Sequence, residues 1–118
     1  MRLKEGTDLT ILINDVYRLW LEYKPDISLA EMRVINKIFY YHDKNINCGH
    51  KELVADLNIP SSALSKLLKR WLDSGEISTK QSKTDKRRNF YYPSELSMNL
   101  RNESFERIKN NKKNINQT

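Results

Sequence analysis

Residues 51–77 read KELVADLNIPSSALSKLLKRWLDSGEI, which is two amphipathic stretches separated by a short break. The first belongs to a helix of about residues 49–57 with three apolar residues on one face: Leu53, Val54 and Leu57. Asn58-Ile59-Pro60 stops this helix, and Ser61 is expected to cap the next one. That second helix turns five side chains inward: Leu64, Leu67, Leu68, Trp71 and Leu72. Two helices joined by so tight a break predict a helix-turn-helix over about residues 49–73.

A basic hairpin is expected directly after Gly75, which favours the left-handed end of a helix. Two short extended runs, Glu76–Gln81 and Asn89–Tyr92, flank the polar segment SKTDKRR, residues 82–88. This segment carries four cations: Lys83, Lys86, Arg87 and Arg88. A hairpin in this place is a wing, here over about residues 76–92, which makes the pattern a winged helix-turn-helix.

Helical periodicity also predicts the flanking elements. A first helix of about residues 8–23, after a Thr7 cap, is apolar on more than one side, which indicates a dimer. Ser28 and Glu31 form a capping box for a second helix with the apolar set Leu29, Met32, Ile35, Ile38 and Phe39. Residues 46–48 are expected to form a short strand, and Ser94 begins a last helix. We therefore expect one α+β domain over residues 1–118 that is mostly helical.

Composition limits the function further. The 118 residues carry a net charge of +6, and the segment from Ser61 to Tyr92 holds eight basic and three acidic residues, so it supplies +5 of that charge. No apolar run reaches the roughly 18 residues of a membrane span, and no secretory signal is evident, so we expect a cytoplasmic, nucleoid-associated protein. No catalytic constellation or phosphate-binding glycine loop is present, so we expect no enzyme. Cys48 with His42 and His50 lacks the paired spacing of zinc sites, so no metal or cofactor is expected.

The arrangement points to double-stranded DNA as the partner. The second helix of such a unit lies in the major groove, and the wing follows the backbone into the minor groove. Asp85, two residues before Arg87, is expected to hold its guanidinium in a bidentate geometry. His50 is expected at a phosphate. The predicted DNA-binding set comprises His50, Ser61, Ser62, Ala63, Ser65, Lys66, Lys69, Arg70, Lys83, Asp85, Lys86, Arg87 and Arg88.

Residues 51–77 together with the wing resemble the DNA-reading core of the MarR family of winged-helix regulators. That family carries an Asp-x-Arg wing motif and a helix-capping hydroxyl residue after the next strand, and Asp85-Lys86-Arg87 and Ser94 stand in these places. The resemblance covers roughly residues 28–100. Redox-sensing members place their reactive cysteine in the first helix, whereas Cys48 lies between the second and third helices, so a peroxide sensor is not indicated.

The resemblance implies a bacterial transcriptional regulator that binds a pseudo-palindromic operator as a homodimer. Such a regulator is expected to repress transcription. It implies a dimer joined through the first and last helices, here about residues 7–23 and 94–113. The corresponding residues are Leu9, Leu12, Ile13, Val16, Trp20, Leu96, Leu100, Phe105 and Ile108. A small-molecule effector is possible, but nothing in the sequence indicates one.

Two other functions stay open at this point. The same fold can read tandem repeats as a plasmid or phage replication or partition factor, and footprinting on repeats rather than on a promoter palindrome would identify that role. It can also serve only as a protein-interaction adaptor, which would bind DNA weakly and without sequence preference.

Overall fold

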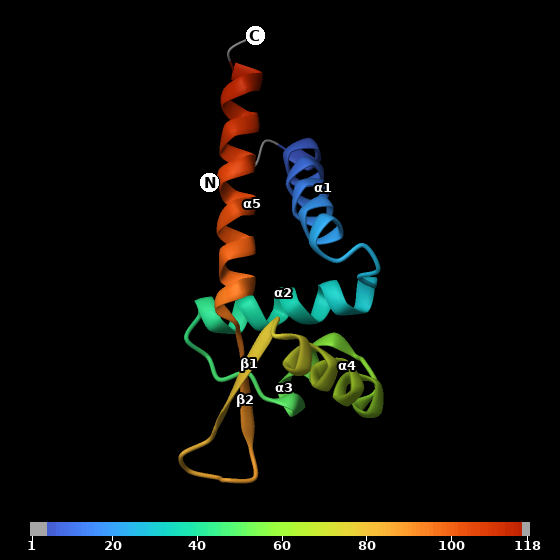
Figure 1. Ribbon diagram of the computed structural model, residues 1–118, viewed down its shortest axis with the longest axis vertical. Coiled ribbons are helices and arrows are strands. Elements are labelled where there is room, and N and C mark those ends of the chain that lie inside the picture. Colours follow the sequence, from blue (N-terminus) through green and yellow to red (C-terminus); the bar gives the residue numbers. More distant parts are fainter. Residues whose placement is uncertain (1–4, 117–118) are drawn as a thin grey trace. The chain divides into compact units, whose positions relative to one another are not determined.

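A computed structural model describes residues 5–116, with side chains over 14–107 and 109–110. Over these residues the chain forms five helices and one two-stranded sheet (Figure 1). The elements are α1 (Glu5–Tyr23), α2 (Leu29–Asp43), α3 (His50–Leu57), α4 (Ser61–Ser74), β1 (Ile77–Gln81), β2 (Asn89–Pro93) and α5 (Glu95–Asn116). The predicted fold class, mostly helical with a winged helix-turn-helix, is confirmed.

The chain divides into two compact units. One contains Met1–Ile27 with Asn99–Thr118, and the other contains Ser28–Met98. The second unit holds α2, α3, α4 and the hairpin, and thus the complete helix-turn-helix and wing. The expectation of one domain over the whole chain stays a prediction.

The core of the second unit lies between α2, α3 and α4, where apolar residues recur every three or four positions and face one another. Its fully buried side chains are Val34, Ile35, Ile38, Leu53, Leu64, Leu68 and Trp71. Leu29, expected in this core, is instead 69% exposed. It lies about 120° around α2 from Ile35 at 3.6 residues per turn, and Val34 occupies the core instead.

The helix starts follow the predicted capping chemistry only in part. The Ser28–Glu31 capping box is present, because each backbone N–H donates to the other residue's side chain, at 3.1 and 3.2 Å. Thr7, expected as a cap, lies inside α1. Ser61 is the first residue of α4 rather than its cap, since Pro60 takes the N-cap position and pre-sets the backbone at φ −55°.

The predicted strand at residues 46–48 is wrong, because these three residues belong to no strand. A single bridge joins Gly49 to Phe90, and the Tyr91 N–H donates to the Cys48 carbonyl at 2.8 Å. These two contacts fix the start of α3 to β2.

The hairpin pairs β1 and β2 antiparallel, from Ile77 opposite Pro93 to Gln81 opposite Asn89, and its loop spans residues 82–88. Gly75 ends α4 at φ 89°, a left-handed conformation that glycine adopts without strain. In Figure 1 the loop lies at the free end of this hairpin, away from the ends joined to α4 and α5.

Ser94 caps α5, as predicted, since its hydroxyl accepts from the Ser97 N–H at 3.3 Å. The Ser94 and Ser97 hydroxyls also donate to the Glu76 carbonyl, which ties the start of α5 to the turn after α4. In the other unit, Glu22 of α1 pairs with Arg107 of α5 at 2.7 Å. None of the described helices has the length and apolar character needed to cross a membrane.

Candidate nucleic-acid interface

One face of α4 is polar and open to solvent. Leu64, Leu67, Leu68 and Trp71 are buried, so the residues between them point outward. Leu72, also predicted to turn inward, is half-buried. Seven predicted DNA-binding residues are exposed there: Ser61, Ser62, Ala63, Ser65, Lys66, Lys69 and Arg70. These residues expose hydroxyls, a methyl group and cations to solvent.

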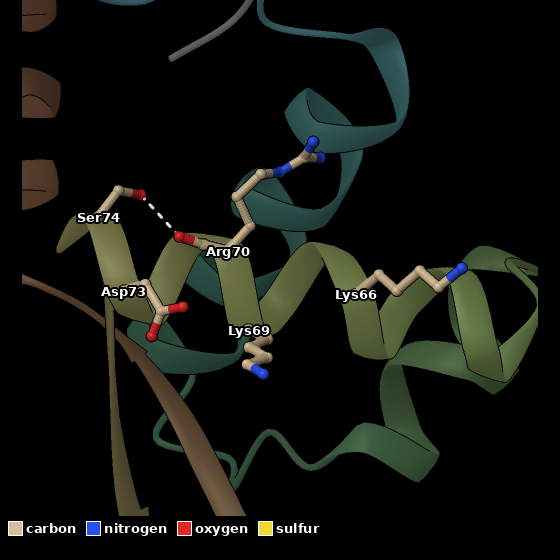
Figure 2. A pocket seen from close by; sticks show the side chains of 5 residues that line it. All are labelled: Lys66, Lys69, Arg70, Asp73 and Ser74. Atoms are coloured by element: carbon tan, nitrogen blue, oxygen red, sulfur yellow. Dashed lines mark hydrogen bonds between the residues drawn. The ribbon is translucent and has the colours of Figure 1, made fainter.

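The cations of α4 do not all face the same way. Figure 2 shows Lys69 and Arg70 leaving α4 in different directions. The Arg70 guanidinium turns toward α2, where its Nη2 lies 3.7 Å from Glu31 Oε2. Glu31 is buried and also accepts a hydrogen bond from the Trp71 indole. Arg70 therefore braces the helix pair, and Lys66 and Lys69 are the cations of the outer face.

A hydrogen bond joins the beginnings of the two helices of the motif. His50 Nε2, in the first turn of α3, lies 2.8 Å from the Ser61 hydroxyl in the first turn of α4. The Ser65 hydroxyl donates to the Ser61 carbonyl at 3.0 Å, so its oxygen keeps lone pairs for an incoming donor. His50, expected as a phosphate contact, thus also orients the start of α4.

The wing loop is held by its own hydrogen bonds. The buried Ser82 hydroxyl accepts from the Thr84 and Asp85 N–H groups at 3.3 and 3.2 Å. The Arg88 N–H donates to the Asp85 carbonyl and the Ser82 N–H to the Arg88 carbonyl, both at 2.9 Å. The loop therefore has a defined shape that presents Lys83, Lys86 and Arg87 as exposed side chains.

Asp85 orients Arg87, although not in the predicted bidentate geometry. A single carboxylate oxygen, Oδ1, accepts both the Arg87 backbone N–H at 3.1 Å and its Nε–H at 3.3 Å. Because the two residues lie so close in the chain, the carboxylate reaches the near side of the guanidinium rather than its terminal fork. The Arg87 side chain is 92% exposed, so its Nη groups face solvent.

Arg88 has a different environment from Arg87. Its Nη2 lies 2.6 Å from Glu52 Oε1 on α3, and its side chain is only 43% exposed. Its guanidinium also lies over the Phe90 ring, 5.3 Å from the centroid. Sequence reasoning missed Glu52, because nothing local links two charges that lie 36 positions apart.

A hollow lies where the first turn of α3, the side of α4 and the base of the wing meet. It has a volume of about 430 Å³ and is lined by His50, Lys51, Ser65, Arg87, Arg88, Asn89 and Tyr91. Four of these are predicted DNA-binding residues, and Lys51, Asn89 and Tyr91 are additions. The sequence offered one signal for two of these additions: Lys51 follows His50 directly, and Asn89 follows Arg88 directly. The structure thus brings α3, α4 and the wing together at one polar, basic concavity.

The charges at this surface are set by their neighbours. Burial raises the pKa of Glu52, but the hydrogen bond and charge of Arg88, with nearby backbone N–H groups, outweigh burial and bring the pKa below its ordinary value. Burial raises the pKa of Cys48 to about 12, helped by the charge of Glu52, so its thiol stays protonated. Within the described residues, His, Cys, Asp and Glu form no group that could hold a metal ion.

The residues expected at a dimer interface differ in exposure. Phe105 is 52% exposed and Leu96 39%, whereas Trp20 is buried and Val16 and Leu100 are half-buried. The side chains of Leu9, Leu12, Ile13 and Ile108 lie outside the described residues. Among the described side chains of α5, Phe105 and Leu96 are the large apolar ones that are exposed.

The arrangement of helices and wing has counterparts among solved structures. The transcriptional regulator Tm0710 from Thermotoga maritima matches with a TM-score of 0.77 at 17% identity, over 92% of this chain and 72% of that one. MarR from E. coli in its apo form matches at 0.60 and 19% identity, over 90% and 77% of the two chains. This chain has the MarR fold.

A third structure with the MarR fold was solved with a nucleic acid. It is a mutant of E. coli MarR complexed with operator DNA, at a TM-score of 0.58 and 20% identity, over 86% of this chain and 71% of that one. No protein-family model matches the sequence, and no curated protein does. The likeness thus rests on the course of the chain, and it confirms the resemblance at the level of the fold.

Proposed function

We propose that this protein is a sequence-specific, double-stranded-DNA-binding transcriptional regulator. The observation that carries this proposal is the basic concavity where the outer face of α4 meets the wing. A helix fits the major groove, where each base pair presents a distinct set of donors and acceptors. Ser62, Ser65 and Lys66 are exposed on α4 in positions to meet base edges, with Lys69 at a phosphate.

The wing supplies the second contact. The exposed Arg87 guanidinium, oriented by Asp85, suits the narrow and electronegative minor groove beside the major-groove site. Lys83 and Lys86 flank it and suit the sugar-phosphate backbone. The likeness to a MarR mutant that was solved with operator DNA supports DNA as the partner.

We further propose that the protein acts as a homodimer on a pseudo-palindromic operator in the bacterial cytoplasm, at the nucleoid, and that it represses. Two recognition helices related by a twofold axis read half-sites about one helical turn apart. The exposed Phe105 and Leu96 of α5 are the proposed apolar contacts between the two copies. A dimer bound over a promoter excludes the polymerase.

Selection of bound duplexes from a random DNA pool tests this function. We expect an enriched palindrome with a half-site spacing of about 10 base pairs. Affinity for that sequence should fall on the order of 1,000-fold or more between 50 and 200 mM salt, because several phosphates are neutralised. Tandem repeats in place of a palindrome would indicate a replication or partition factor. Weak binding without enrichment would indicate an adaptor.

A further inference from the structure

The wing is attached to α3 as well as to the strands that carry it. Three contacts join α3 and the two residues before it to the first residues of β2 and the residue before that strand: the bridge between Gly49 and Phe90, the Tyr91 N–H bond to the Cys48 carbonyl, and the Arg88–Glu52 ion pair. The first two are main-chain contacts that fix β2. The ion pair adds a side-chain link between the loop end of the wing and α3.

Arg88 makes two side-chain contacts in this attachment. One side of its guanidinium meets Glu52 at 2.6 Å, and its face lies over the Phe90 ring at 5.3 Å. Cation–π contact and a charge-assisted hydrogen bond together hold a planar guanidinium in one orientation. Arg87, the preceding residue, is paired with a carboxylate of its own loop and is 92% exposed.

Gly49 makes room for the pair. A Cβ atom at this position would lie 2.6 Å from Glu52 Oε2 and 3.0 Å from Arg88 Nη2. The backbone at Gly49, φ −98° and ψ 172°, is one that any residue adopts, so conformation does not require glycine there. The ends of the Glu52 and Arg88 side chains, as paired, occupy the space beside Gly49, so a larger residue there would have to displace them.

We propose that Arg88 and Glu52 form a clamp that positions the wing against the first turn of α3, so that Arg88 supports DNA binding through Glu52 rather than through a phosphate. This rests on the proposed DNA-binding function and assigns the two adjacent arginines different roles. Arg87 reaches the DNA, and Arg88 is a positioning residue that holds the strand from which Arg87 extends.

The clamp also hides a negative charge. Glu52 stays ionised because its pKa lies below the ordinary value: Arg88 and nearby backbone N–H groups outweigh the effect of burial. An unpaired carboxylate beside the concavity would repel phosphates. In the pair, Arg88 neutralises the charge of Glu52. The side chains of the concavity that remain available to DNA are then those of His50, Lys51 and Arg87.

Amide exchange on the free protein tests the clamp without DNA. In Arg88→Met, which keeps an apolar stem over Phe90, exchange of the Tyr91 amide should rise about threefold, as expected for loss of a partly exposed ion pair. Glu52→Gln should give a rise in the same direction. The matched control, Arg87→Met, should leave Tyr91 exchange unchanged. Unchanged exchange in Arg88→Met would overturn the proposal.

A charge swap tests the same clamp through DNA binding, with the duplex selected above as the probe. Arg88→Glu alone should lower affinity at least tenfold, since two carboxylates then repel at the base of the wing. Adding Glu52→Arg should restore affinity to within about threefold of the wild type, because the pair reforms in reverse. A double variant as weak as Arg88→Glu would show that Arg88 contacts phosphate, and the clamp would be wrong.

The amide-exchange experiment and the DNA-binding experiment test the clamp and the proposed function separately. If the wild-type protein binds no duplex, the proposed function fails, and the exchange of the Tyr91 amide still decides whether the clamp exists. Thermal unfolding followed by circular dichroism checks that each variant remains folded.

Discussion

At the scale of single residues, two similar side chains of the wing have different environments. Arg87 and Arg88 are adjacent and chemically identical, yet one is 92% exposed and the other 43% exposed and paired with Glu52. Sequence reasoning grouped them as two DNA contacts, because local charge pattern does not reveal a partner on another element. The distinction arises only when α3 and β2 meet.

Replacement of Arg87 by alanine should weaken binding to the selected duplex about tenfold or more, because a groove contact by arginine typically contributes about 1–3 kcal/mol. The melting temperature should stay within error, since the side chain is almost fully exposed. Titration with labelled duplex measures the loss. Lys44→Ala, which removes an exposed cation at the end of α2, is the control, and an equal loss there would argue against a specific wing contact.

Cys48 should react with thiol reagents only when the protein unfolds. Its side chain is 1% exposed, and its pKa is raised to about 12, so thiolate is scarce at neutral pH and reagent has no access. In a spectrophotometric thiol assay the native protein should react slowly and the protein in denaturant at once. Rapid labelling of the native protein, or a change of DNA affinity with mild peroxide, would contradict this assignment.

At the scale of elements, different sides of α4 make different contacts. Its buried leucines were predictable because helical periodicity is a local property, and so was the capping box of α2. The direction of Arg70 was not, since it depends on Glu31, which lies 39 positions earlier in the chain. The same reason explains the missing strand at residues 46–48, where a single bridge to Phe90 replaces the pairing expected from residue type.

Two neighbouring alanine substitutions on α4 should therefore behave differently. Lys69→Ala should reduce the slope of log affinity against log salt by about 0.9, the effect of one lost phosphate contact, and leave stability unchanged. Arg70→Ala should leave that slope unchanged and lower the melting temperature, since it removes the partner of buried Glu31. An equal reduction of the slope in both variants would show that both side chains contact phosphate.

The contact of α2 with α4 through Glu31 should make stability depend on pH in the acid range. Burial raises the Glu31 pKa, but hydrogen bonds from Trp71 and Ser28 and the charge of Arg70 bring it below its ordinary value of 4.5. The folded state thus favours the carboxylate. Its contribution is complete above pH 4.5 and is lost as pH falls through the lower folded-state pKa.

Glu31→Gln should remove that contribution, at a cost of about 1 kcal/mol or more at neutral pH. Because the variant has no carboxylate to protonate, its deficit relative to the wild type should shrink as pH falls below about 4. Urea unfolding at several pH values measures this. Glu106→Gln, at an exposed position of α5, should show no such convergence. A deficit that is constant with pH would contradict the role of the ionised carboxylate.

At the scale of the whole molecule, the predicted fold class and the likeness to MarR agree, although no more than about a fifth of the residues are identical in the structures compared. Apolar periodicity and one tight break suffice to specify this chain course. Dimer geometry is not encoded so locally, because it depends on which apolar side chains remain exposed once each copy has folded.

If the proposed dimer forms, Phe105→Asp should shift it to monomer, since the variant places a charge at the proposed apolar contact between copies. Sedimentation velocity measures the change, and affinity for a palindromic duplex should fall more than affinity for a single half-site. Asn102→Asp introduces the same charge at an exposed polar position of α5 and should remain dimeric. A wild-type protein that sediments as a monomer at micromolar concentration would contradict the proposed assembly.

The hydrogen bonds within the wing loop have a further consequence for docking. Ser82, Asp85 and the Gln81 amide, which donates to the Lys86 carbonyl at 2.6 Å, already fix the loop's path in the free protein. A segment that arrives with its conformation set loses little entropy when it settles into a groove. Association should then not require a separate step in which the loop becomes ordered. The association rate constant should therefore depend on charge and ionic strength, and not on a slow rearrangement of the loop backbone.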